Sequence, residues 1–257
     1  MCAIRCIDLS CPMANGAHEP RPPEIYYMGH KEFGEKSAAG WGLKLEQLHD
    51  GLGSQTEFIK VSTHSATHMD APLHYGPTVA GKPSRSIDQV PLEWCFADGV
   101  VLDLRHKKTG DYITAADIEA CLKKINYKVK EGDIVLLWTG TDEKRSDPNY
   151  AELHPGMSIE ATEYLMDRGV RIIGIDAFGF DRPFGVQIPE FKAGDRRALM
   201  PCHHILGRRR EYLQIEQMAS MGSIPKPHGF KIACFPINVE KASGAWVRPV
   251  AIVDDGK

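Results

Sequence analysis

Two short apolar runs constrain the fold more than any other feature of this sequence. Residues 133–138 (Asp-Ile-Val-Leu-Leu-Trp) and 170–175 (Val-Arg-Ile-Ile-Gly-Ile) have the length and composition of buried strands. Between them Ser158 is a good N-cap for a helix over Ile159–Arg168, and Gly169 is a typical helix stop. The succession of strand, helix and strand predicts an α/β fold.

The rest of the chain adds strands on both sides of this unit. A helix is expected from the N-cap Thr114, with Asp117 three residues later, to about Lys124. Because the C-terminal part is rich in strands, we expect one α/β domain with a mixed sheet, spanning residues 1–257. The further strands are expected at 4–9, 57–62, 100–104, 212–216, 230–237 and 247–253.

The segment 12–55 contrasts with this regular pattern. It is rich in Pro, Gly and His, and Pro20, Pro22 and Pro23 argue against regular structure in it. Long irregular segments are uncommon in compact domains and often cover a binding site. We therefore expect this segment to be irregular and to cover the active site.

Composition excludes several classes of function. The 257 residues carry a formal net charge of −3, which gives no reason to expect a nucleic-acid partner. No apolar stretch is long enough to cross a bilayer, and the first residues lack the pattern of a signal peptide. Seven scattered cysteines make a poor disulfide framework. We expect a cytoplasmic protein that acts on a small molecule.

The stretch from residue 62 to 74 concentrates groups that carry chemistry. His64, His68, Asp70 and His74 fall within eleven residues. β-Branched neighbours and Pro72 favour an extended chain over a helix, and residues of equal parity in an extended chain point to one side. Two imidazoles and one carboxylate are a common open catalytic set for zinc, and the same ligands suit manganese. His64, His68 and Asp70 are therefore predicted metal ligands.

The same stretch, His64-Ser-Ala-Thr-His-Met-Asp-Ala-Pro-Leu-His74, resembles the signature HxGTHxDxPxH of the cyclase-like metal hydrolases. That family includes bacterial arylformamidases (kynurenine formamidases) and isatin hydrolases. One position differs, because Ala66 replaces the usual glycine, and alanine would be strained if the backbone there needs a positive φ. Further similarities are the segments 7–10 (Ile-Asp-Leu-Ser), 137–140 (Leu-Trp-Thr-Gly), 154–156 (His-Pro-Gly) and 173–176 (Ile-Gly-Ile-Asp).

The resemblance implies a swivelling β/β/α fold and a larger ligand set. The family carries a His and a Glu about twelve residues apart near the C-terminus, and His204 and Glu216 match that spacing. His203 is the competing candidate, and we prefer His204. By analogy, His64, His68 and Asp70 would hold a first metal, and Asp70, His204 and Glu216 a second. The family usually forms homo-oligomers, dimers in particular.

The implied reaction is hydrolysis of a small amide by a metal-activated water, with His74 as the proton shuttle. Opening of a cyclic amide, as in isatin hydrolases, is preferred, and aryl formamide cleavage is second. Aromatic residues that could contact a flat substrate ring are Trp41, Tyr75 and Phe178. The alternatives are a metal-dependent lyase or cyclase that acts through an enolate, and a metal-binding relative without catalysis.

Overall fold

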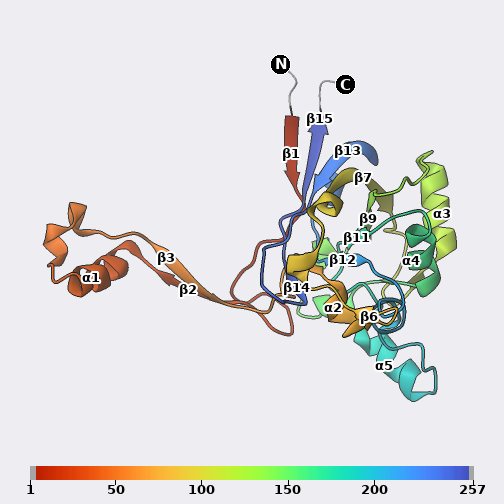
Figure 1. Ribbon diagram of the computed structural model, residues 1–257, viewed down its shortest axis with the longest axis horizontal. Coiled ribbons are helices and arrows are strands. Elements are labelled where there is room, and N and C mark those ends of the chain that lie inside the picture. Colours follow the sequence, from red (N-terminus) through yellow and green to blue (C-terminus); the bar gives the residue numbers. More distant parts are fainter. Residues whose placement is uncertain (1–3, 255–257) are drawn as a thin grey trace. The chain divides into compact units, whose positions relative to one another are not determined.

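The two apolar runs form neighbouring parallel strands, β9 (Ile134–Trp138) and β11 (Ile172–Ile175). The computed structural model describes residues 4–254, and in it these strands lie at the centre of a nine-stranded mixed sheet of order β1-β15-β13-β7-β9-β11-β12-β4-β14 (Figure 1). The predicted mixed-sheet α/β fold is confirmed. The other strands of this sheet are β1 (Ile4–Asp8), β4 (His68–Asp70), β7 (Phe96–Asp103), β12 (Leu213–Glu216), β13 (His228–Ala233), β14 (Gly244–Trp246) and β15 (Val250–Asp254).

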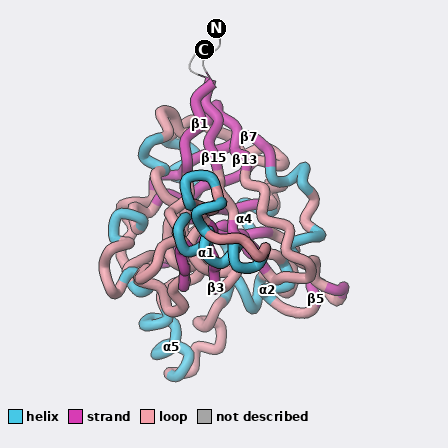
Figure 2. The backbone as a smooth tube through the Cα atoms, turned by 90° about the vertical axis from the view of Figure 1, so that its left-hand side faces the viewer, coloured by secondary structure: helices cyan, strands magenta, loops and turns pink. Residues whose placement is uncertain are grey.

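The type of strand pairing changes twice across the sheet, from antiparallel to parallel and back. The four central strands, β7, β9, β11 and β12, are parallel to one another, and every remaining neighbour pairs antiparallel. Figure 2 shows β1, β15, β13 and β7 side by side at one end of the sheet. The antiparallel strands β4 and β14 continue the sheet beyond β12, and β4 is the strand that carries part of the metal motif.

Side chains of the central strands alternate between two buried apolar clusters. Val135 and Leu137 point into one cluster, and Ile134 and Leu136 point into the other. Burial on both faces explains why β9 and β11 are apolar throughout instead of alternating with polar residues. The first cluster is completed by the helices α3 (Ala115–Lys124) and α4 (Ile159–Met166), which lie side by side over the sheet (Figure 1).

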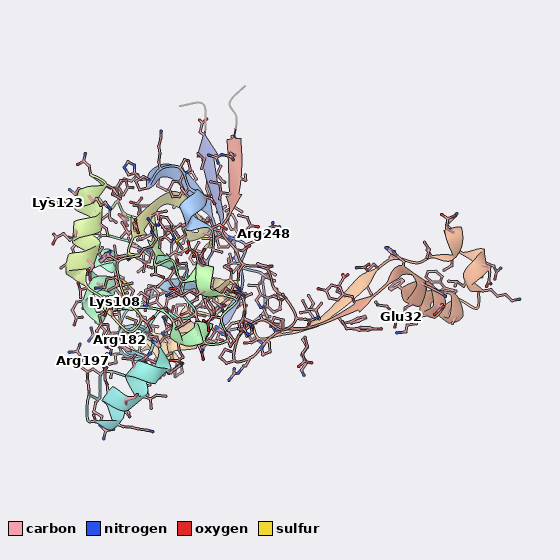
Figure 3. The ribbon with its side chains drawn as sticks, turned by 180° about the vertical axis from the view of Figure 1, so that it is seen from behind. Glu32, Lys108, Lys123, Arg182, Arg197 and Arg248 are labelled. Carbon is pink, nitrogen blue, oxygen red and sulfur yellow. The ribbon has the colours of Figure 1, made fainter. Side chains whose placement is uncertain are left out.

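Both helices begin at the residues that the sequence indicates. The Thr114 side chain accepts a hydrogen bond from the Asp117 backbone N–H, and Ser158 Oγ accepts one from Ala161 N at 3.1 Å. The amphipathic pattern of α3 places Ile118 against the sheet, while Lys123 points away from it (Figure 3). These N-caps satisfy backbone donors that have no partner inside a helix.

Short elements complete the larger part of the chain. The helices α2 (Pro72–Tyr75) and α5 (Phe184–Lys192) and the π-helical turn Pro201–Leu206 were not expected from the sequence. The remaining short strands are β5 (Thr78–Val79), β6 (Lys82–Pro83), β8 (Tyr112–Ile113) and β10 (Gly156–Met157). Short 3-10 turns occur at Ile87–Gln89, Leu92–Cys95, Asp142–Lys144, Tyr150–Glu152 and Met221–Ser223.

The chain divides into two compact units. The smaller unit, Met13–Ala17 with Arg21–Ser62, pairs β2 (Glu24–Met28) with β3 (Thr56–Lys60) and contains α1 (His30–Gly40). It also contains 3-10 turns at Leu45–Gln47 and His49–Gly51. The larger unit comprises Met1–Pro12, His18–Pro20 and Thr63–Lys257.

The smaller unit corrects the expectation of an irregular segment over 12–55. Prolines 20, 22 and 23 precede β2 and disrupt regular structure only there. Within α1, Glu32, which is labelled in Figure 3, accepts a hydrogen bond from Lys36 at 2.8 Å. Gly34 and Gly53 meet so closely that a Cβ on Gly53 would lie 2.7 Å from Gly34 N, which explains two of the glycines. That this segment covers the active site stays a prediction.

The carboxylate of Asp176, directly after β11, fixes the end of β9. Its Oδ1 accepts hydrogen bonds from Thr139 N (2.8 Å) and Thr139 Oγ1 (2.6 Å), and its Oδ2 accepts one from Gly140 N (2.7 Å). Asp176 is fully buried, and burial raises its pKa to about 7. The buried Asp176 carboxylate therefore holds the Thr139–Gly140 backbone, at the end of β9, next to the end of β11.

Replacing this carboxylate should cost substantial stability. Asp176→Ala leaves three donors without their acceptor, and we expect the free energy of unfolding to fall by about 2–4 kcal/mol. The measurement is urea denaturation at pH 7. The matched control is Asp167→Ala, which removes an exposed ion pair with Arg210 (2.6 Å) and should change stability by less than about 1 kcal/mol. Equal effects of the two substitutions would contradict the assigned role.

Candidate metal centre

Sheet register brings three of the predicted ligands together. In the antiparallel pair of β4 and β12, His68 lies opposite Glu216 and Asp70 lies opposite Gln214. Directly opposite residues point to the same side of a sheet, so His68, Asp70 and Glu216 share one face. Met69 and Ile215, which alternate with them, point into the apolar cluster on the other face. The equal-parity argument is therefore confirmed for His68 and Asp70.

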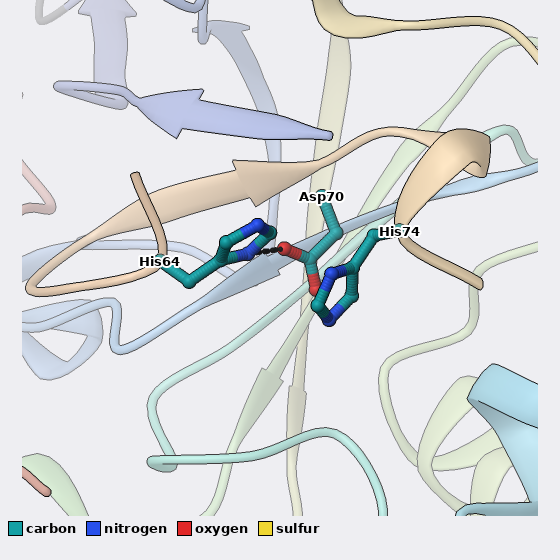
Figure 4. A group of neighbouring side chains, drawn as sticks. All are labelled: His64, Asp70 and His74. Carbon is teal, nitrogen blue, oxygen red and sulfur yellow. Dashed lines mark hydrogen bonds and ion pairs between the residues drawn. The ribbon is translucent and has the colours of Figure 1, made fainter. Parts of the chain in front are cut away.

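His64 reaches the same place by a different route. It lies in a turn before β4 instead of in an extended strand, which corrects the expectation of one extended segment. Figure 4 shows its ring turned toward Asp70, with Nδ1 2.6 Å from Asp70 Oδ1. Its Nε2 lies 2.9 Å from Ser243 Oγ. Ser243 is thus a partner of the site that sequence reasoning did not identify.

The turn is possible because Ala66 adopts a left-handed backbone, with φ 54°. This conformation is the one in which the glycine expected from the family signature would be unstrained, whereas a Cβ is disfavoured. The turn also lets His68 Nδ1 approach the Ala66 carbonyl oxygen at 2.9 Å. That contact leaves His68 Nε2 directed toward the carboxylates of Asp70 and Glu216.

His74 comes from α2, whose first residue is Pro72. Its ring stacks on the His64 ring with centroids 4.1 Å apart and 29° between the planes (Figure 4). His64, Asp70 and His74 offer ligand atoms that all lie within 4.8 Å of one another, and so do His68, Asp70 and Glu216. Asp70 belongs to both groups, as the resemblance implies. The other members differ from the expected sets, because His64 is grouped with His74 instead of His68, and Glu216 with His68 instead of His204.

Gly244 provides the space for the His64 ring. Residue 244 pairs with Asp70 across β14 and β4, and a Cβ there would lie 2.7 Å from His64 Cε1 and 2.8 Å from the Met69 carbonyl oxygen. Neither atom can move freely, because the carbonyl is backbone and the ring is held by Asp70 and Ser243. No sequence signal distinguished this glycine from the other glycines of the chain.

Gly244→Ala should therefore displace His64 while leaving the apolar core in place. We expect turnover to fall by roughly 10-fold or more and stability to fall by about 1–3 kcal/mol, the usual cost of overpacking. The checks are steady-state kinetics and thermal denaturation. The control is Gly40→Ala at the end of α1, where nothing lies within 4 Å of an added Cβ and, as at Gly244, φ lies outside the left-handed region. Equal turnover losses in the two variants would contradict the role of Gly244.

His203, and not His204, completes the cluster. The π-helical turn Pro201–Leu206 directs His203 inward, with Nε2 3.6 Å from Asp70 Oδ2 and 3.7 Å from Glu216 Oε1. His204 is exposed, so our preference for it was wrong. Consecutive residues of a helical turn point in clearly different directions, so only one of the two imidazoles faces the sheet.

Asp181 orients His203 and was missed by sequence reasoning. Its Oδ2 lies 2.6 Å from His203 Nδ1, and its two oxygens accept hydrogen bonds from Cys202 N (2.8 Å) and His203 N (3.2 Å). A carboxylate on Nδ1 fixes the ring and leaves Nε2 with its lone pair toward Asp70 and Glu216. The sequence offers no signal for this role beyond the position of Asp181 shortly after a buried strand.

The electrostatics of the cluster favour a cation. His68 Nε2 lies 3.4 Å from Asp70 Oδ1 and 3.6 Å from Glu216 Oε2. Burial alone would lower the pKa of His68, but the carboxylates of Asp70 and Glu216 outweigh it and raise that pKa to about 9. Burial, reinforced by the charge of Asp70, raises the pKa of Glu216 to about 7. Two buried carboxylates thus face two imidazoles in a region that stabilises positive charge.

This arrangement fits a divalent metal. His68, Asp70 and Glu216 each offer one ligand atom within 4.8 Å of the others, and His203 Nε2 approaches the other oxygens of the same two carboxylates, at 3.6 and 3.7 Å. Among residues 4–254, Asp70 Oδ2 is a buried carboxylate oxygen that accepts no hydrogen bond, as expected of a ligand atom. The donor set has two nitrogens and two carboxylates, and it suits zinc or manganese equally.

The three aromatic candidates for substrate contact differ in position. Tyr75 is fully buried, stacks on Tyr212 and meets the His203 ring edge-on at 5.4 Å, so it supports His203 and leaves no surface for a substrate. The prediction for Tyr75 is therefore corrected. Phe178 is half-buried and packs edge-on against Tyr150. Trp41 belongs to the smaller unit and is 68% exposed. The roles of Phe178 and Trp41 stay predictions.

Comparison with known proteins identifies the family to which this chain is similar. The Cyclase family model, described as "Putative cyclase", matches residues 7–182, more than half of the chain. The chain is 24% identical over 216 residues to an isatin hydrolase of Roseibium aggregatum, covering 79% of this chain and 77% of that protein. It is 27% identical over 192 residues to a kynurenine formamidase of Geobacillus thermodenitrificans, covering 74% and 76% of the two chains.

The fold has a close counterpart among solved structures. A crystal structure of an isatin hydrolase bound to the product analogue thioisatinate superposes with a TM-score of 0.77 at 19% identity, covering 98% of this chain and 93% of that one. Among residues 4–254, no helix is long and apolar enough to span a membrane. From the family match over residues 7–182 and the agreement of the fold, we conclude that this chain belongs to the cyclase family.

Proposed function

We propose that this protein is a metal-dependent hydrolase of small amides, and that it opens a cyclic amide of the isatin type. The observation that carries the proposal is the placement of two buried imidazoles, His68 and His203, each facing the carboxylates of both Asp70 and Glu216. Relatives named isatin hydrolase and kynurenine formamidase support hydrolysis and favour these two substrate classes. Aryl formamide cleavage is the second candidate.

His68, Asp70, His203 and Glu216 would hold the metal, zinc or manganese, with one or two ions per chain. When bound, a divalent ion supplies a nucleophilic water at neutral pH and positive charge for the amide carbonyl oxygen. The chain's own contribution is orientation. Asp181 fixes the His203 ring through Nδ1 at 2.6 Å, and the Phe180 backbone N–H fixes Glu216 Oε1 at 2.8 Å.

His74 is the residue we assign to proton transfer. A tetrahedral intermediate of amide hydrolysis breaks down only when its leaving nitrogen receives a proton. The His74 ring lies beside Asp70 and stacks on His64, whose own nitrogens are engaged by Asp70 and Ser243. The His64 ring therefore supports the His74 ring from one side, and Pro72 at the start of α2 fixes the backbone that carries His74.

The test measures metal and turnover on the same sample. We would purify the protein without added metal, quantify metal per chain by elemental analysis, and assay isatin and N-formylkynurenine before and after chelation. We expect bound zinc or manganese, chelator-sensitive turnover, and isatin as the faster substrate. No metal after reconstitution would overturn the proposal.

The same assay separates hydrolysis from the lyase alternative. Hydrolysis of isatin in ¹⁸O-labelled water should place one labelled oxygen in the product carboxylate, because water adds to the amide carbonyl. A lyase or cyclase that acts through an enolate adds no water. Metal binding with neither product formation nor label incorporation would favour that alternative or a non-catalytic relative.

We further propose that the protein is a homodimer, with the β2–β3 ribbon as its contact surface. Tyr26 and Phe58 stack on one face of the ribbon, with centroids 6.4 Å apart, and they are 48% and 58% exposed. Tyr27 and Ile59 are 56% and 52% exposed. A two-stranded ribbon is at best marginally stable alone. Exposed apolar clusters of this kind mark interaction sites. Both points support association with a second copy. A cytoplasmic location stays a prediction.

Light scattering coupled to size-exclusion chromatography tests this arrangement. We expect the wild type to have the mass of two chains and the double variant Tyr26→Ser/Phe58→Ser to shift toward one. The control is Phe96→Ser, which removes an equally exposed aromatic (49%) from the larger unit. A monomeric wild type at micromolar concentration would contradict the proposal.

A further inference from the structure

Two residues next to the metal ligands have left-handed backbones. Ala66, between His64 and His68, has φ 54°, and Gln217, directly after Glu216, has φ 56°. Neither is glycine, so each conformation is disfavoured by its Cβ. Such residues persist where surrounding contacts over-determine them, and they concentrate at functional sites. The contacts that hold these two residues therefore also set the positions of the ligands beside them.

Glu19 provides the contact at Ala66. Both carboxylate oxygens of Glu19 lie 3.2 Å from the Ala66 backbone N–H, which donates to them. The Glu19 side chain is only 3% exposed. A carboxylate buried to this extent is costly unless it is paired, and Arg145 Nη2 lies 2.9 Å from Glu19 Oε1. The charge of Glu19 is thus balanced within the larger unit.

The same arginine holds Gln217. Arg145 Nη1 donates to Gln217 Oε1 at 2.9 Å, and the Gln217 carbonyl accepts a hydrogen bond from Thr67 Oγ1 at 2.6 Å. Thr67 is the residue after Ala66, so the chain of contacts closes on itself. Cys11 N donates to Thr67 Oγ1 at 2.8 Å and joins a further segment to the ring. One network therefore connects the turn before β4 with the end of β12.

We propose that Glu19 and Arg145 are positioning residues of the metal centre. They clamp the left-handed backbones at Ala66 and Gln217 and thereby hold His68 and Glu216 at the separation that a metal requires. This inference rests on the proposed metal-dependent function, and neither residue needs to contact the metal or the substrate. Sequence reasoning had no access to it, because Glu19 lies 47 residues before Ala66 in a proline-rich segment.

The experiment measures zinc affinity of metal-free protein by competition with a chromophoric chelator. We expect Glu19→Ala and Arg145→Ala each to raise the zinc Kd by about 10- to 100-fold, the range seen when partners of metal ligands are removed. Glu19→Gln should have a smaller effect, because its amide oxygen still accepts from Ala66 N–H. The matched control is Asp103→Ala, which removes an exposed pairing with Arg105 at 2.8 Å and should leave the Kd unchanged.

A second substitution separates positioning from general stability. Glycine adopts positive φ without strain, so Ala66→Gly should make the turn less dependent on the clamp and partly restore zinc affinity in the Glu19→Ala background. In metal-free protein, the unfolding midpoints of the four variants of this cycle should be non-additive. Unchanged zinc Kd in Glu19→Ala, or additive midpoints, would overturn the inference. A wild type that binds no zinc would instead remove the proposed function, and the cycle would still decide whether Glu19 holds the turn.

Discussion

His203→Ala should abolish metal-dependent turnover, whereas His204→Ala should leave it intact. His203 Nε2 faces Asp70 and Glu216 at 3.6 and 3.7 Å, while His204 is exposed. Removing the His203 imidazole leaves Asp70 Oδ2 and Glu216 Oε1 without the nitrogen that faces them. We expect metal affinity to fall by at least about 100-fold and turnover with it, since loss of a ligand is more severe than loss of a partner of a ligand.

The adjacent histidines make an unusually close internal control. The two variants lose the same side chain from the same π-helical turn, so differences in helix propensity and composition cancel. Metal per chain by elemental analysis and kcat/KM on isatin would be measured for both after the same reconstitution with one equivalent of metal. If His204→Ala were the variant that lost metal, or if both kept it, the assignment of His203 would be wrong.

The strands and capped helices were predictable because their signals are local. The runs that became β9 and β11 are apolar at nearly every position, which follows directly from burial on both faces. Thr114 and Ser158 cap their helices through side chains that any sequence reader can identify. The smaller unit was missed because its order depends on the pairing of β2 with β3, which lie 28 residues apart at their near ends, rather than on local composition.

The metal centre was predictable only in part, for a related reason. His68 and Asp70 follow from strand parity, but the register that sets Glu216 opposite His68 is a long-range property of the sheet. The choice between His203 and His204 depends on the rotational phase of a short π-helical turn, which composition does not encode. The warning about Ala66 was correct, since its φ is indeed positive, but the side chain that holds it there comes from a distant segment.

His74→Ala should lower kcat by about 10²- to 10⁴-fold while leaving metal content unchanged. The range is that of a lost general acid–base group, and His74 is assigned to carry a proton rather than to bind metal. Burial lowers the pKa of His74 to about 4, with the charge of Asp70 opposing that shift. The ring is thus neutral at pH 7, where it can accept a proton before delivering one. Kinetics on isatin and elemental analysis of the same preparation test this.

The competing role for His74 is a metal ligand, because it lies within reach of a shared ion with His64 and Asp70. The two roles predict different results for His74→Ala. If His74 were a metal ligand, the variant would lose metal and turnover together. If His74 carries a proton, the variant would lose only turnover. His106→Ala, at an exposed histidine outside the site, should change neither, because its ring lies 3.6 Å from the α3 carboxylate of Asp117 and away from the cluster.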